Sequence, residues 1–174
     1  MEPVEVVVEI PAGSRNKYEF DHERHLFRLD RVLYSSVHYP ADYGFVPETL
    51  EPDGDPLDAL VLVYEPTFPG CHVLALPIGC LDMVDEKGED RKLITLPCGD
   101  PRFAHITSLE ELGTHWLREI ENFFQTYKNL EEKWSEIVGW RDATFAAQVI
   151  AQARARYQAQ QRPTGRRAAR RRGG

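Results

Sequence analysis

The chain has 174 residues, of which 42% are hydrophobic and 28% charged, and its formal net charge is −7. These values are typical of one globular domain with a full hydrophobic core, and they do not require a second domain. Six of the 21 basic side chains are arginines within residues 162–174, so residues 1–161 carry 15 basic and 28 acidic side chains, a formal charge of −13. A body this acidic argues against a nucleic-acid-binding surface.

The cysteines and the apolar runs indicate where the protein works. Cys71, Cys80 and Cys98 are odd in number and far apart, and they form no CxxC pair and no zinc-like spacing with the histidines. No apolar run approaches the roughly 18 residues of a membrane span, and the N-terminus lacks a basic-then-apolar leader. We therefore expect a soluble, cytoplasmic protein with free thiols, no membrane partner and no zinc centre built on these residues.

The first third of the chain predicts mainly β structure. Residues 4–10 are β-branched and mostly alternate in polarity, residues 17–20 form a short alternating piece, and residues 26–34 alternate again. Residues 38–47 contain three aromatic residues and two prolines. We expect this last segment to be an apolar loop whose tyrosines fill the core.

Charged residues interrupt these alternating patterns. Lys17 and Glu19 share one face of their predicted strand, where they could form a simple surface ion pair or belong to a site. Arg31 breaks an otherwise apolar row. An arginine in such a place usually pairs with a carboxylate or a phosphate.

The segment Asp53-Gly54-Asp55-Pro56-Leu57-Asp58 places three carboxylates within six residues, directly before an apolar run. Its glycine and proline favour a turn that leads into a buried strand. Two carboxylates roughly 5 Å apart repel by about 3 kcal/mol at an effective dielectric near 20, so this crowding favours a divalent cation. The alternative is a solvated acidic turn. An EF-hand is excluded, because Leu57 and Asp58 occupy its fifth and sixth positions.

A second acidic turn follows further along the chain. Residues 71–84 predict one or two strands, residues 85–90 a hairpin connection and residues 92–96 the return strand. Asp85 and Asp90 flank the connection and can approach each other. The alternative is a hairpin tip that is charged for solubility alone.

The last third of the chain predicts helices. Ser108-Leu109-Glu110-Glu111 has the pattern of a capping box, and the helix after it ends near Lys128, where a cation commonly opposes the helix dipole. Residues 135–140 predict a final strand, and Asp142 is expected to cap a second helix that runs to about residue 160. We expect the arginine-rich tail, residues 162–174, to be disordered.

Together these elements predict an α+β fold, a small OB-like β-barrel of five to six strands with two main C-terminal helices packed against it. Residues 1–161 would form its single domain. Ionisable residues at several strand ends would gather into a basin of acids fringed by cations, which suits hard divalent metals and phosphate. An oligonucleotide-binding barrel is the rival interpretation, which the fold and the basic tail favour and the acidic body opposes.

The segment Asp53–Ala59 resembles the signature of the soluble family I inorganic pyrophosphatases of bacterial type, and the resemblance spans about residues 4–160. Several separate motifs carry it in order: Glu9-Ile10-Pro11-Ala12, Lys17-Tyr18-Glu19, Asp30-Arg31, Tyr39–Gly44, Asp85–Lys92, Phe123-Phe124 and Tyr127-Lys128. The resemblance implies a Mg²⁺-dependent diphosphatase. Such an enzyme hydrolyses pyrophosphate to two orthophosphates through in-line attack by metal-activated water, without a covalent intermediate.

The resemblance also implies a role for thirteen side chains. Six carboxylates are expected to bind metal: Glu9, Glu19, Asp53, Asp58, Asp85 and Asp90. Six groups are expected to hold the phosphoryl ends: Lys17, Arg31, Tyr43, Lys92, Tyr127 and Lys128. Asp55 is expected to orient or deprotonate the attacking water, and Asp90 is the alternative proton acceptor. Several Mg²⁺ ions per site, with Mn²⁺ or Zn²⁺ as substitutes, and a homohexamer are expected as well.

Overall fold

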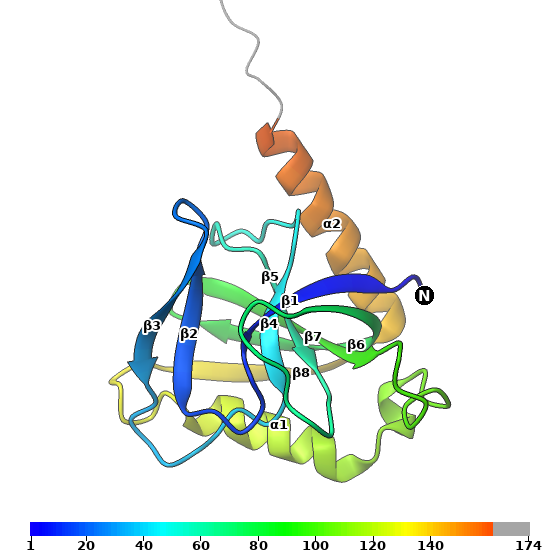
Figure 1. Cartoon of the computed structure of the whole chain (residues 1–174), viewed down its shortest axis with the longest axis horizontal. Coiled ribbons are helices and arrows are strands. Elements are labelled where there is room, and N and C mark those ends of the chain that lie inside the picture. Colours follow the sequence, from blue (N-terminus) through cyan, green and yellow to red (C-terminus); the bar gives the residue numbers. More distant parts are fainter. Residues whose placement is uncertain (162–174) are drawn as a thin grey trace, which may run out of the picture.

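The computed structural model describes residues 1–161, which contain eight strands and two long helices (Figure 1). The strands are β1 (Val4–Ile10), β2 (Asn16–Asp21), β3 (Leu26–Val32), β4 (Asp42–Val46), β5 (Leu57–Val61), β6 (His72–Asp85), β7 (Gly88–Pro97) and β8 (Ser135–Asp142). The helical segments are η1 (Leu109–Glu111), α1 (Thr114–Thr126) and α2 (Ala143–Gln161). The predicted disordered tail lies outside the described residues.

Six strands form one sheet in the order β1-β4-β5-β7-β6-β8. β1 also pairs with β6, and this pairing closes five of the strands into a barrel while β8 extends the sheet beyond β6. The β2–β3 hairpin stands beside the barrel, and α1 and α2 lie on different sides of it (Figure 1). The predicted α+β fold, an OB-like barrel with two helices, is confirmed.

The pleat of the strands divides the core into two clusters. On β5, Ala59 and Val61 belong to the cluster that contains Val149 of α2. Leu60, which points to the opposite face, belongs to the cluster that contains Phe124 of α1. We call this second cluster the α1-side core. Because side chains two positions apart on a strand share a face, Asp58 lies on the same face of β5 as Leu60, at the end of the α1-side core.

One expected loop is a strand. β4 lies within residues 38–47 and all of its residues are buried, because it pairs with both β1 and β5. Asp42, the only acidic residue of β4, accepts hydrogen bonds from the backbone N–H of Ala12 at 2.8 Å and of Thr67 at 3.0 Å. The Asp42 carboxyl is therefore hydrogen-bonded inside the fold. The loop prediction was wrong for residues 42–46, although Tyr39 and Tyr43 are buried as expected.

The expected capping box does not start a long helix. Ser108 precedes only the short segment η1 and makes no side-chain cap, whereas Glu111 accepts a 2.7 Å hydrogen bond from the backbone N–H of Thr107. Gly113, with φ of 87°, then separates this segment from α1, which begins at Thr114. A positive φ at that position ends the first helical segment and lets the chain turn before the second one begins.

The close packing of β4 against β1 leads to a first prediction. A Cβ added at Gly44 would lie 1.9 Å from the carbonyl oxygen of Val7 and 2.8 Å from the Cα of Val8. Because these neighbours are backbone atoms of a paired strand, Gly44→Ala should lower the free energy of unfolding by about 4 kcal/mol or more, or prevent folding. Gly99→Ala is the matched control, since its Cβ would meet nothing within 4 Å. Urea denaturation checks both variants, and a wild-type midpoint for Gly44→Ala would contradict the strand packing.

Candidate active site

A cavity of about 500 Å³ brings together all thirteen side chains that the sequence singles out. They come from β1 to β5, from the turn before β5, from the β6–β7 hairpin and from the residues directly after α1. Segments as far apart as residues 9 and 128 therefore meet in one place. This convergence is the arrangement that a basin of acids with a cationic fringe requires.

The lining of the cavity is strongly charged, with an excess of acids. Its eleven acidic side chains are Glu9, Glu19, Asp30, Glu51, Asp53, Asp55, Asp58, Asp85, Glu86, Glu89 and Asp90. Its seven basic side chains are Lys17, Arg31, Lys87, Arg91, Lys92, Lys128 and Lys133. With four more acids than bases, this cavity repels a small polyanion unless further cations enter with it.

The deepest charge in the cavity is the ammonium of Lys92, whose side chain is 3% exposed. β5 and β7 run parallel with Asp58 and Lys92 as register partners, so their side chains lie together. Lys92 Nζ donates to Asp90 Oδ1 at 2.6 Å, to Asp58 Oδ2 at 2.8 Å and to the Tyr43 hydroxyl oxygen at 3.1 Å, while that hydroxyl donates to Asp58. All three donors of the ammonium are therefore used.

Burial and pairing set the protonation of these groups. Burial raises the pKa of Asp58, and the neighbouring Lys92 opposes this rise. Burial also acts to lower the pKa of Lys92, but attraction by Asp58 and Asp90 is stronger and holds that pKa well above its ordinary value. Lys92 thus remains charged at neutral pH.

A second group of charges lies on the β2–β3 hairpin. Lys17 and Arg31 are register partners across the two strands. Lys17 forms an ion pair with Glu19 and lies 3.4 Å from Asp30 Oδ2. Arg31 donates through Nη1 to Asp30 and through Nη2 to Glu131 Oε2, the latter at 2.6 Å. Glu131 was not predicted, because it follows Arg31 by 100 positions and no local pattern links the two.

The β6–β7 hairpin supplies the remaining ion pairs. Lys128 Nζ donates to Asp85 Oδ2 at 2.9 Å, and both side chains are largely buried. Burial acts to raise the pKa of Asp85, but the hydrogen bond from Lys128 lowers it overall. At the exposed mouth, Lys87 Nζ donates to Asp55 Oδ2 at 3.1 Å. Lys87 was also missed, although its position between the acids of the hairpin tip was a usable signal.

The donor set of the cavity fits a hard divalent cation. The candidate ligands are all carboxylates, which suit Mg²⁺ or Mn²⁺ better than softer metals. Within residues 1–161, no three Asp, Glu, His or Cys side chains are grouped closely enough to enclose a metal ion. Ion pairs with lysine keep these carboxylates apart from one another. Lys92 lies between Asp58 and Asp90, and Lys128 forms an ion pair with Asp85. Lysine ammonium groups thus provide the positive charge that these carboxylates need.

Fold and site together define a class of protein. A small closed barrel whose acidic cavity carries Lys, Arg and Tyr groups is suited to a hydrolase that handles a phosphate-bearing anion with divalent cations. Comparison with known proteins identifies the family. A family model described as inorganic pyrophosphatase matches residues 6–158.

The individual relatives agree with this match. An inorganic pyrophosphatase of Methanosarcina mazei is 53% identical over 157 residues, covering 90% of this chain and 93% of the relative. One from Geobacillus stearothermophilus is also 53% identical over 157 residues, covering 90% and 95%. The crystal structure of inorganic pyrophosphatase from Thermus thermophilus superimposes with a TM-score of 0.88 at 44% identity, covering 90% of this chain and 92% of that one.

The chain belongs to the inorganic pyrophosphatase family. Its members are enzymes that hydrolyse pyrophosphate to orthophosphate and require divalent metal ions, so the enzyme class expected from the sequence is confirmed. No helix within residues 1–161 is long and apolar enough to cross a membrane.

The buried carboxylate of Glu9 leads to a second prediction. Burial raises its pKa from 4.5 to about 7, although its hydrogen bond from the Phe20 N–H opposes the rise. A folded-state pKa above the unfolded value adds stability that is fully present below pH 4.5 and is lost as the pH rises through 7. In metal-free protein, wild type should therefore lose about 3 kcal/mol relative to Glu9→Gln between pH 4.5 and pH 8.

Urea denaturation in the presence of EDTA at both pH values checks this expectation, with Glu9→Gln as the reference for every other titrating group. Parallel stability curves for the two proteins would show that the Glu9 carboxyl titrates normally.

Proposed function

We propose that this cavity is the active site in which the chain hydrolyses inorganic pyrophosphate, with Mg²⁺ as its divalent cation. The activity follows from the family, and the convergence of thirteen expected residues in one cavity supports the location. Pyrophosphate is a compact polyanion, and the excess of acids in the lining would repel it. Divalent cations must therefore enter with the substrate or before it.

We further propose that six carboxylates hold the cations, namely Glu9, Glu19, Asp53, Asp58, Asp85 and Asp90. When bound, Mg²⁺ would reverse the local field and lower the pKa of a water molecule, and Mn²⁺ or Zn²⁺ would serve as substitutes. Four of these carboxylates, Glu19, Asp58, Asp85 and Asp90, are now paired with lysines, which supports the assignment because each pair marks a place where positive charge is favourable. Lys92 would regain donors for another ligand once its carboxylates take other partners.

The phosphoryl ends are proposed to bind six groups around the cavity: Lys17, Arg31, Tyr43, Lys92, Tyr127 and Lys128. The planar guanidinium of Arg31 suits bidentate contact with phosphate oxygens, and Asp30 and Glu131 already hold it in place. Hydrogen bonds and charge from this fringe would stabilise the equatorial and leaving oxygens as attack proceeds.

Asp55 and Asp90 are the two proposed candidates for accepting the proton of the attacking water, and their surroundings differ. Asp55 is 65% exposed and pairs with an exposed lysine, so its oxygens reach water easily. Asp90 is 21% exposed and is bound by the ammonium of Lys92 at 2.6 Å. These surroundings favour Asp55 as the acceptor, with Asp90 as the alternative. Attack in line on one phosphorus needs no covalent intermediate.

A phosphate-release assay tests the proposed substrate and metal. The full chain with pyrophosphate and Mg²⁺ should release two orthophosphates per substrate, and excess EDTA should remove the activity until Mg²⁺ is restored. An oligonucleotide shift assay with residues 1–161 should show no binding, because this acidic part of the chain repels nucleic acid. Absence of phosphate release at any Mg²⁺ concentration would contradict the proposal.

Substitution of Asp55 tests its role directly. Asp55→Asn keeps the size of the side chain and removes the base, so kcat should fall by about 10²–10⁴-fold while folding and metal binding change little. Asp100→Asn, which changes a turn aspartate outside the cavity, should keep wild-type kcat. Steady-state kinetics with calorimetric Mg²⁺ binding separates the two effects. Near-wild-type turnover in Asp55→Asn would transfer the acceptor role to Asp90.

The assembly, location and extent of the enzyme are also proposals. We propose a homohexamer, as the family resemblance implies, and a cytoplasmic location, which the free thiols of Cys71, Cys80 and Cys98 support. We propose residues 1–161 as the single catalytic domain. The family match over residues 6–158 supports this boundary.

A further inference from the structure

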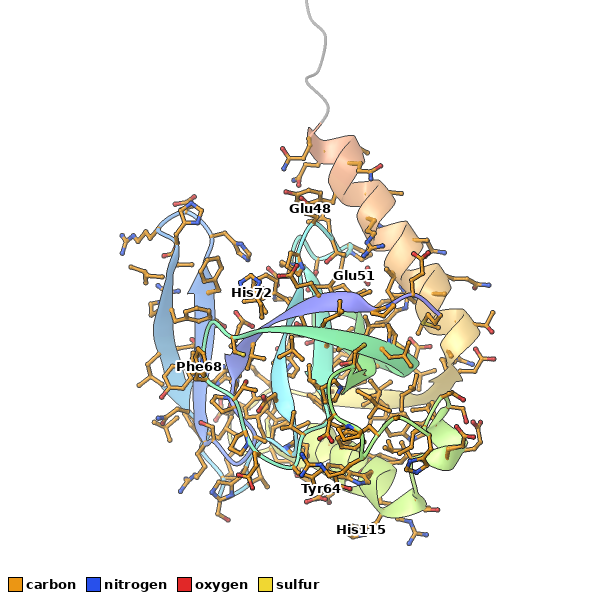
Figure 2. The ribbon with its side chains drawn as sticks, turned by 45° about the vertical axis from the view of Figure 1, so that its right-hand side comes forward. Glu48, Glu51, Tyr64, Phe68, His72 and His115 are labelled. Atoms are coloured by element: carbon orange, nitrogen blue, oxygen red, sulfur yellow. The ribbon has the colours of Figure 1, made fainter. Side chains whose placement is uncertain are left out.

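Glu51 is a buried acid that the proposed chemistry does not use. Its side chain is 7% exposed and lies between two arginines from different elements. Arg156 of α2 donates through Nη1 to Glu51 Oε1 at 2.7 Å, and Nη1 of Arg91 on β7 lies 3.7 Å from Oε2. Figure 2 shows Glu51 in the angle between the sheet and α2. A carboxylate kept in such a place is costly unless its partners hold it tightly.

The same residue closes the acidic turn through its backbone. The N–H of Glu51 donates to the carbonyl of Asp55 at 2.8 Å, and this hydrogen bond joins the two ends of the turn that contains Asp53. Just before it, the N–H of Leu50 donates to the carbonyl of Ala153 on α2 at 3.0 Å. Arg156 also donates to the carbonyl of Leu50 at 3.1 Å. The acidic turn is thus attached to α2 at two adjacent residues.

On its other side, Glu51 faces the strand that carries the second acidic group. Arg91 directly follows Asp90 on β7, and its side chain is only 12% exposed. It lies 3.7 Å from Asp82 Oδ1 and 5.8 Å from the ring centroid of Phe145 on α2. Through Arg91 and Arg156, one carboxylate therefore links the acidic turn, β7 and α2.

The two links differ in tightness. Glu51 Oε2 and Arg91 Nε are buried without a hydrogen-bond partner among the described residues, so the contact with Arg91 is an ion pair without a hydrogen bond. The contact with Arg156 is a short charge-assisted hydrogen bond. Arg156 is therefore the partner that sets the orientation of Glu51.

We propose that Glu51 and Arg156 are positioning residues, through which α2 sets the place of the acidic turn relative to Asp90 and so its affinity for divalent cations. The proposal rests on the metal and catalytic roles proposed above for Asp53, Asp55 and Asp90. Residues that orient metal-binding groups from behind commonly change metal affinity or activity by about 10–100-fold when they are replaced.

The test uses the full chain and replaces Arg156 by methionine, which keeps much of its apolar stem. Arg156→Met should lower kcat by about tenfold or more and weaken Mg²⁺ binding, measured by calorimetry without substrate, by about tenfold. KM for pyrophosphate at saturating Mg²⁺ should change little, because the proposed phosphoryl-binding groups lie outside the turn. Arg156→Lys keeps the charge and should recover part of both losses.

The matched control is Arg154→Met. Arg154 is exposed on the same helix and has no ion pair with any residue in the described range. It should keep the wild-type kcat and Mg²⁺ affinity, which separates loss of the Glu51 contact from a general loss of positive charge on α2.

A double-mutant cycle shows whether the two residues act through each other. Glu51→Gln should resemble Arg156→Met, and the double variant should lose no more than either single variant. Full additivity of the two effects, or calorimetric Mg²⁺ binding within about twofold of wild type in folded Arg156→Met, would overturn the proposal. If Arg156→Met does not fold, Glu51→Gln and Arg156→Lys carry the same test.

The outcome also separates this proposal from the one on which it rests. If Asp55→Asn is inactive while Arg156→Met is fully active, only the positioning role fails. If Asp55→Asn and Arg156→Met both turn over at the wild-type rate, the positioning role fails and the acceptor role passes to Asp90. The proposed function itself fails only if the wild-type chain releases no phosphate at any Mg²⁺ concentration.

Discussion

The structure depends on the ammonium of Lys92, which is buried between two carboxylates at the end of the barrel. Without it, Asp58 and Asp90 would repel each other beside the α1-side core, and breaking a buried ion pair by removing one partner costs about 3–5 kcal/mol. The parallel register of β5 and β7 places Lys92 beside Asp58, and the pleat brings Asp90 to the same face. One pairing thus connects the barrel topology with the chemistry at its mouth.

The same logic applies throughout the cavity. Several of its acids are paired with cations from other segments of the chain, as Asp85 is with Lys128 and Asp55 with Lys87. Such a lining satisfies part of its charge internally, and the excess of four acids remains available for added cations. An enzyme for a small polyanion needs both properties, because the acids bind metal and the bases bind phosphate. Acids and bases lie side by side around the cavity. A base that loses its carboxylate partner to a metal ion therefore becomes available to bind phosphate.

Much of the fold was predictable because local pattern and tertiary structure agree. The expected hairpin is present, although its turn covers only residues 86 and 87 because β7 already begins at Gly88. Asp142 caps α2 as expected, through a 2.8 Å hydrogen bond from the Phe145 N–H. The prediction failed where tertiary contacts override local composition. β4 was predicted as a loop because two prolines flank it, yet pairing on both sides makes it a buried strand. Glu51 gave no signal, since its partner Arg156 follows 105 positions later.

The most direct test of the account is a crystal structure of the full chain grown with Mn²⁺, with anomalous scattering used to locate the ions. The account predicts Mn²⁺ in the acidic cavity, bound by carboxylates of Asp53, Asp58 and Asp90, with the Lys92 ammonium displaced from at least one of its carboxylate partners. Mn²⁺ bound only outside the cavity, with the Lys92 contacts unchanged, would contradict it.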